Sequence, residues 1–121
     1  MPRTLIIDDD EPMRKMLVEL LMREGHTVDG APNGRAALKQ MEADLYDLVI
    51  TDIVMPDMEG LELIAHLRKA HPRLPVIAMS GGARVGPESY LQMADMLGAR
   101  YTFEKPMKPS DLLAAVRDCL E

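Results

Sequence analysis

The sequence predicts an α/β fold in which a doubly wound, five-stranded parallel sheet carries helices on both faces. Two observations predict it. Short apolar runs alternate strictly with segments whose apolar residues recur every three to four positions, as they do in amphipathic helices. The apolar runs also lack the polar-apolar alternation of a sheet with one solvated face, so both faces of each strand are expected to be buried. Strands that are separated by helices pair in parallel, and right-handed crossovers then allow few topologies.

The first two strand-helix units occupy the N-terminal part of the chain. A strand is predicted at 4–7, and Pro12 suits the first turn of the helix that follows it. The apolar stripe predicted for this helix is Met13, Met16, Leu17, Leu20 and Leu21. Gly25 is a suitable residue to end the helix. A short second strand is predicted at 26–29, and Asn33 is expected to cap the second helix.

Three further units complete the chain. The remaining strands are predicted at 47–51, 75–79 and 100–104. Gly60 opens a helix that ends before Pro72, residues 90–97 form a helix of mixed pattern, and Pro109 opens the last helix. Five such units fit the flavodoxin-like strand order 2-1-3-4-5, whose switch point lies between the first and third strands. Residues 1–121 are expected to form a single domain with no output domain attached.

Composition excludes several functional classes. A net charge of −6 and a pI near 5.0 argue against a nucleic-acid-binding surface, which is normally basic. The single cysteine, Cys119, excludes an internal disulfide and is expected to be a small packing residue. No apolar run reaches the roughly 18 residues of a membrane span, and the N-terminus lacks a signal-peptide layout. We therefore expect a cytoplasmic protein.

Charged and polar residues stand at the carboxyl ends of four predicted strands. Asp8 and Asp9 follow the first strand, Asp52 the third, Ser80 the fourth and Lys105 the fifth. Because these ends share one edge of a parallel sheet, the side chains are expected to lie together. Two like charges ~5 Å apart repel by about 3 kcal/mol at an effective dielectric near 20, so a cation must offset them. Lys105 can offset one charge, and Mg²⁺, which carboxylates, waters and phosphate typically hold, can offset the rest.

These residues carry a resemblance to a known family. The pair Asp8-Asp9, the segment 52–60, Ser80 with the small Gly81, and the pair Lys105-Pro106 occur in this order along the chain. With them the whole chain resembles the response-regulator receiver domain of two-component signalling, in particular the chemotaxis-type single-domain regulators. The ordered set is far more specific than any one of its motifs.

The resemblance implies a phosphoryl-accepting site. Asp52 is the implied phosphoacceptor, Ser80 would hydrogen-bond the phosphoryl group, and Lys105 would pair with it. The family also leads us to expect a cis peptide bond between Lys105 and Pro106.

The resemblance to receiver domains also implies a cofactor. Asp9, Asp52 and the backbone carbonyl of Val54 would ligate Mg²⁺, and Asp8 would act through a metal-bound water.

The partners implied by the family are a histidine kinase or phosphotransfer protein as the phosphoryl donor and a downstream protein that the sequence does not identify. Direct binding of nucleic acid or of a membrane is not expected. A homodimer through the fourth helix, the fifth strand and the last helix is left open. The chain would not be an enzyme, since it would catalyse only its own phosphorylation and dephosphorylation.

The chain departs from the family pattern near the surface through which receivers commonly signal. Thr102 stands where many receivers carry a tyrosine or phenylalanine that turns inward on activation. Its neighbour Tyr101 is expected to point to the opposite face of the sheet, because side chains alternate along a strand. Ser80 and Lys105 also lie further apart in sequence than is usual in the family. Inheritance of the aromatic switch is therefore left open.

The sequence argues against three alternative functions. A phosphatase of the haloacid dehalogenase type usually carries an aspartate two residues beyond its nucleophile, where this chain has Val54. A flavodoxin-like cofactor carrier needs a phosphate-cradling loop after the first strand, where this chain has three aspartates. A receiver-like binding module that is not phosphorylated is disfavoured by the intact set of Asp9, Asp52, Ser80 and Lys105.

Overall fold

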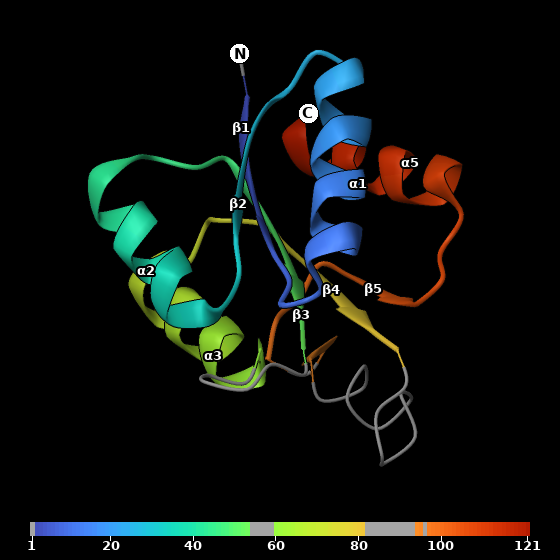
Figure 1. The fold of residues 1–121 in the computed structure, drawn as a ribbon. Coiled ribbons are helices and arrows are strands. Elements are labelled where there is room, and N and C mark those ends of the chain that lie inside the picture. The colour runs from blue at the N-terminus through green and yellow to red at the C-terminus, as the bar shows by residue number, and fades with distance from the viewer. Residues whose placement is uncertain (1, 54–59, 82–93, 96) are drawn as a thin grey trace.

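A computed structural model describes residues 2–53, 60–81, 94–95 and 97–121, and these residues form one layered α/β unit (Figure 1). Its elements are β1 (Arg3–Ile7), α1 (Glu11–Arg23), β2 (Thr27–Ala31), α2 (Gly34–Ala43), β3 (Leu48–Asp52), α3 (Gly60–Ala70), β4 (Val76–Ser80), β5 (Tyr101–Glu104) and α5 (Pro109–Leu120). The alternation of strands and helices agrees with the sequence prediction.

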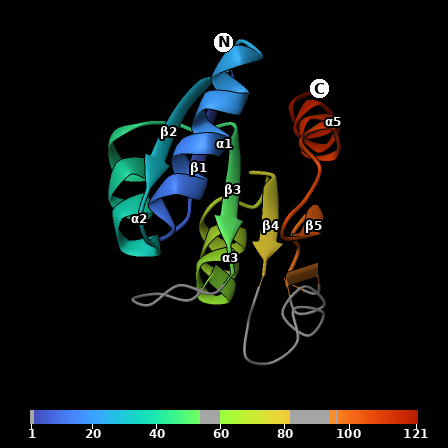
Figure 2. The ribbon, with the colours of Figure 1, turned by 45° about the vertical axis from the view of Figure 1, so that its right-hand side comes forward.

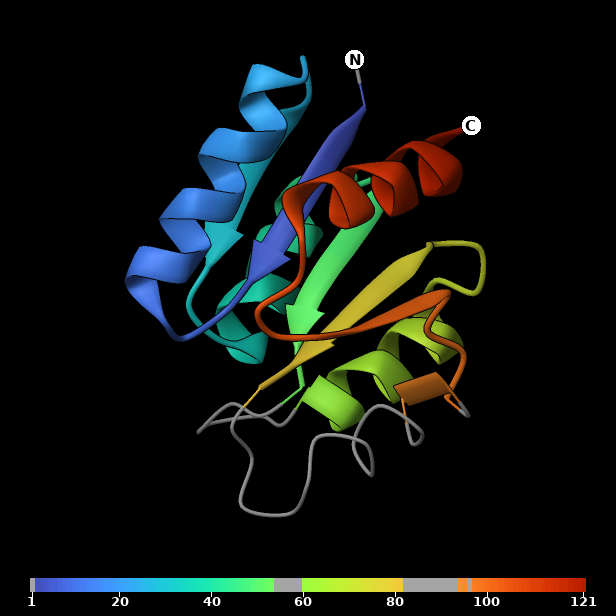
Figure 3. The same ribbon diagram turned by 90° about the vertical axis from the view of Figure 1, so that its right-hand side faces the viewer.

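The five strands form one sheet in the order β2-β1-β3-β4-β5, and every neighbouring pair is parallel. This is the predicted flavodoxin-like order. The chain leaves β1 toward β2 on one side and passes to β3 on the other, so the switch point lies between β1 and β3. Figure 3 shows that the carboxyl ends of the strands share the lower edge of the sheet.

Helices cover both faces of the sheet, as predicted. Residues from α2 and α3 pack on one face, where Val49 of β3 lies in the core, and residues from α1 and α5 pack on the other, where Ile50 lies. Figures 1 and 2 show the two helical layers with the sheet between them. All five residues of β3 and of β4 are buried, which explains why these strands are apolar without alternation.

Helix α1 begins as its sequence predicts, but the predicted apolar stripe wrongly includes one residue. The Asp10 side chain caps the helix by accepting from the Met13 amide at 3.3 Å, and a proline lies in the first turn. Leu17 and Leu21 are buried, whereas Met16 is 53% exposed. At about 100° per residue, Met16 lies about 100° from Leu17, on the side away from Leu21. The centre of the stripe faces the sheet, and Met16 falls beyond its edge.

Strand boundaries differ from the prediction mainly in β2. The strand was predicted at 26–29 but runs from Thr27 to Ala31, because all five of its residues pair with β1. Gly30 has a low intrinsic preference for strands, and pairing with a buried neighbour overrides that preference. Elsewhere the differences are one or two residues: Asp52 and Ser80 are the last residues of β3 and β4 rather than the first residues after them.

Part of the sequence prediction lies outside the described residues. The helix predicted at 90–97 falls mostly there, although Ala94 and Asp95, which are described, are helical. Gly98, predicted to break that helix, has a φ of 99°, a value that favours glycine. Within the described part of the chain, no helix has the length and apolar character needed to cross a membrane.

Candidate functional site

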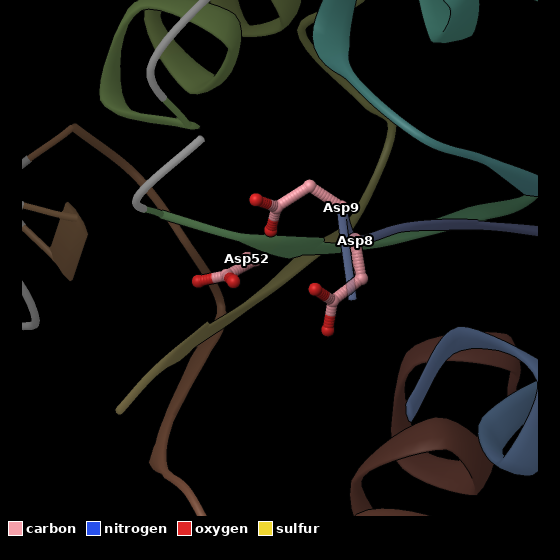
Figure 4. A group of neighbouring side chains, drawn as sticks. All are labelled: Asp8, Asp9 and Asp52. Carbon is pink, nitrogen blue, oxygen red and sulfur yellow. The ribbon is translucent and has the colours of Figure 1, made fainter. Parts of the chain in front are cut away.

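Three carboxylates meet at the carboxyl edge of the sheet. Asp8 and Asp9 directly follow β1, and Asp52 ends β3, so the three residues flank the switch point. Each offers one carboxylate oxygen, and these oxygens lie within 4.8 Å of one another. Figure 4 shows the three carboxylates gathered around one space at the end of the two strands. Asp8 and Asp52 are buried while Asp9 is exposed, so the cluster can be reached from solvent.

Lys105 supplies a positive charge to this cluster. Its ammonium Nζ donates to Asp8 Oδ2 at 2.8 Å and to Asp52 Oδ2 at 3.2 Å, although 97 positions separate Lys105 from Asp8 in sequence. Burial alone lowers the pKa of Lys105, but the hydrogen bond to Asp8 and the charges of Asp52 and Asp8 outweigh it and raise the pKa overall. Lys105 therefore remains protonated at neutral pH and offsets one of the three negative charges.

The donor set fits Mg²⁺. Three carboxylates and one ammonium leave two negative charges in excess, and one oxygen of each carboxylate lies within 4.8 Å of the others, a grouping that could hold one metal ion. Carboxylate oxygens are hard ligands, and Mg²⁺ is usually bound by one or two of them together with waters and a phosphate. A doubly charged cation of this kind would bring the cluster to neutrality.

Ser80 is a buried hydroxyl at the end of β4. It has no exposed surface, and its Oγ has no hydrogen-bond partner among the described residues. A buried hydroxyl left unsatisfied costs about 1–3 kcal/mol, so a ligand that accepts from it would recover part of this cost. The Ser80 carbonyl accepts from the Lys105 amide at 2.7 Å, which joins the end of β4 to Lys105.

Two glycines fit closely against this edge. A Cβ on Gly60 would collide with the Asp52 carbonyl oxygen and with the Ile53 Cα, and the Gly60 amide donates to the Ile53 carbonyl at 2.6 Å. A Cβ on Gly81 would lie 2.7 Å from the Lys105 Cβ. The sequence predicted Gly60 as a bend that starts the helix, and not as a close contact with the backbone. The sequence did contain a signal of this close contact. The first turn of a helix does not need the flexibility of glycine, so a glycine there can indicate that another part of the backbone lies against it.

The remaining expectations about the site have mixed outcomes. The Lys105–Pro106 peptide is cis, as the resemblance implied. The backbone carbonyl of Val54 lies outside the described residues. Cys119 is buried in the core, as predicted for a packing residue.

Tyr101 points away from the site. Its ring stacks on Phe103 with 6.4 Å between centroids, and its hydroxyl donates to Asp118 of α5 at 2.5 Å. This hydrogen bond is the main cause of a raised pKa of Tyr101. Both aromatic rings pack in the cluster shared with α1 and α5. Alternation then directs Thr102 to the other face, so Tyr101 cannot take the place of the missing aromatic residue.

Because the carboxylates repel one another, we predict that Asp9→Asn stabilises the metal-free protein. Asp9 is exposed, so removing one of the three negative charges, whose oxygens lie within 4.8 Å of one another, should raise the free energy of unfolding by only about 1 kcal/mol. Urea unfolding in EDTA measures this change, and added Mg²⁺ should stabilise the variant less than the wild type. Glu62→Gln, an exposed charge removal in the first turn of α3, is the control. A lower stability of Asp9→Asn in EDTA contradicts the prediction.

Comparisons with known proteins agree with this geometry. The model of the response regulator receiver domain family matches residues 4–117. The chemotaxis protein CheY of Thermotoga maritima is 34% identical over 115 residues, which cover 94% of this chain and 93% of that protein.

Solved structures are similar over nearly the whole chain. A CheY-like receiver domain protein from Methanospirillum hungatei has a TM-score of 0.90 and 31% identity, covering 99% of this chain and 94% of its own. The response regulator TrrA from Thermotoga maritima, in complex with Mg²⁺-BeF, has a TM-score of 0.87 and 32% identity, covering 99% of this chain and 100% of its own.

Proposed function

Because the chain belongs to the response-regulator receiver family of two-component systems, we propose that it accepts a phosphoryl group on Asp52 and signals through protein-protein contacts. The donor would be a phosphohistidine on a histidine kinase or phosphotransfer protein. The observation that carries the proposal is the cluster itself: Asp52 lies at the switch point with two further carboxylates, and its Oδ2 accepts from the Lys105 ammonium.

The chemistry is a transfer between two nucleophiles. A carboxylate oxygen of Asp52 would form a bond to phosphorus while the bond from phosphorus to the histidine nitrogen breaks. The imidazole leaves with the electron pair of that bond and takes up a proton. An aspartate is a competent covalent acceptor, and catalysis of such transfers consists mainly of positioning and charge neutralisation.

Two residues would receive the incoming group. Lys105 is already directed at an oxygen of Asp52, 3.2 Å away, so its charge can pair with the phosphoryl group once the carboxylate becomes an acyl phosphate. The Ser80 hydroxyl, buried and without a partner among the described residues, would donate to a phosphoryl oxygen. Both contacts strengthen as negative charge arrives at the site.

The cofactor of this proposal is Mg²⁺. Asp9 and Asp52 would hold it together with the carbonyl of Val54, and Asp8 would act through a water bound to it. Bound there, the ion would neutralise the oxygens of the phosphoryl group. The similar TrrA, whose structure contains Mg²⁺-BeF, supports this assignment.

Incubation of the purified protein with acetyl phosphate tests the proposal. We expect the intact mass to rise by one phosphoryl group when Mg²⁺ is present and to stay unchanged in EDTA, because the uncompensated carboxylates repel the anionic donor. No added mass with Mg²⁺ would instead indicate a binding module that is not phosphorylated. Sustained release of phosphate without a modified protein would indicate a hydrolase.

A further inference from the structure

Arg14 of α1 is bound to the backbone beside the carboxylate cluster. Its guanidinium Nη1 donates to the carbonyl oxygen of Asp8 at 2.8 Å in a partly buried position. That carbonyl belongs to the peptide group joining Asp8 to Asp9, and a peptide group is planar. A hydrogen bond to its oxygen therefore restrains the orientation of this peptide plane, which contains the backbone nitrogen and Cα of Asp9.

The route of the Arg14 side chain depends on Gly30 in β2. A Cβ on Gly30 would lie 3.1 Å from the Arg14 Cδ and 3.3 Å from its Cγ. These distances are shorter than ordinary van der Waals contacts, so a side chain at this position would push the stem of Arg14 aside. The missing side chain of Gly30 thus leaves the space through which Arg14 reaches the Asp8 carbonyl.

The other polar groups of Asp8 are also held. Its amide donates to the Ala31 carbonyl at 3.1 Å, its Oδ1 accepts from the Asp10 amide at 3.0 Å, and its Oδ2 accepts from Lys105. Asp9 is exposed, in contrast to the fully buried Asp8, so packing restrains it less. The direction of its carboxylate therefore depends more on the backbone that carries it, and the Arg14 contact acts on that backbone.

We propose that Arg14 is a positioning residue for the metal site: it fixes the Asp8–Asp9 peptide so that the Asp9 carboxylate faces Asp52. Gly30, which has no side chain, leaves the space that the Arg14 side chain occupies. The inference rests on the Mg²⁺ site of the proposed function. Partners that orient metal ligands typically change metal affinity 10- to 100-fold when they are removed.

Mg²⁺ titration of the metal-free protein by calorimetry tests this role. Arg14→Met keeps much of the aliphatic stem and removes the donor, and it should bind Mg²⁺ about tenfold more weakly than the wild type. Arg14→Lys keeps the charge but loses the guanidinium geometry, and it should also be weaker. Gly30→Ala should give a smaller loss, and the Arg14→Met/Gly30→Ala double variant should be no weaker than Arg14→Met alone, because both changes act through one contact.

Two controls separate positioning from other effects. Lys15→Met removes a positive charge from the same helix at an exposed position paired with Glu11, and it should leave Mg²⁺ affinity unchanged or slightly stronger. Urea unfolding in EDTA shows whether a variant is generally destabilised, and the affinity loss should persist in conditions where each variant is fully folded. These two measurements distinguish a role in the site from a role in the fold alone.

The outcomes are distinguishable from failure of the proposed function. If the wild type does not bind Mg²⁺, or if Asp52→Asn binds it equally well, the metal site itself is refuted. If the wild type binds and Arg14→Met binds as tightly or more tightly, Arg14 acts at most through its charge and the positioning role is refuted. Independent, additive losses from Arg14→Met and Gly30→Ala would refute the part assigned to Gly30.

Discussion

Asp52→Asn is expected to abolish incorporation of a phosphoryl group from acetyl phosphate in the presence of Mg²⁺. The amide has nearly the shape of the carboxylate but lacks its charged nucleophilic oxygen, so the bond to phosphorus cannot form. Intact mass spectrometry measures the result, with the wild type gaining one phosphoryl group and the variant none. A mass increase that survives the substitution would refute Asp52 as the acceptor.

Asp47→Asn is the matched control for this experiment. Asp47 lies just before β3, at the opposite end of the strand that Asp52 ends, and its Oδ2 accepts from the Arg3 amide at 2.8 Å. The asparagine side chain keeps an oxygen that can accept this bond, so the fold is retained while one carboxylate is lost. The control variant should be phosphorylated to the wild-type extent.

Gly60→Ala is expected to lower the free energy of unfolding by about 3 kcal/mol or more, at the upper end of the usual cost of overpacking. The added methyl group would meet the Asp52 carbonyl oxygen and the Ile53 Cα, and it would lie 2.9 Å from the Ile53 carbonyl carbon. These are backbone atoms of a buried strand end and cannot rotate away as a side chain can. Urea unfolding in EDTA measures the loss.

Gly30→Ala is the matched comparison, since its nearest neighbours are atoms of the flexible Arg14 side chain. We expect it to cost less than about 1 kcal/mol, because a side chain can shift by a few tenths of an ångström at little cost. Gly60→Ala should also slow phosphorylation, since any relaxation of its clash moves the backbone of Asp52. Equal stability losses in the two alanine variants would contradict this explanation.

The sequence predicted the site largely because parallel strands end at one edge. Once the apolar runs were placed in the order 2-1-3-4-5, Asp8, Asp9 and Asp52 had to flank the switch point, and the structure brings their carboxylates within 4.8 Å. The prediction failed where packing overrides local pattern. Met16 fits the periodicity of α1 but faces solvent, and Gly30 extends β2 because β1 lies beside it.

The sequence by itself determined the order and type of the described elements, the residues delivered to the carboxyl edge, and the facing of Tyr101 away from Thr102. These follow from periodicities and strand ends, which depend on neighbours along the chain. Only the tertiary structure decided which atoms meet: the Lys105 ammonium between Asp8 and Asp52, Gly60 against the backbone of β3, and Arg14 on the carbonyl of Asp8. The first contact joins distant parts of the chain, and the other two each join the end of a strand to the helix that follows it, so their geometry is set by how the packed elements approach one another.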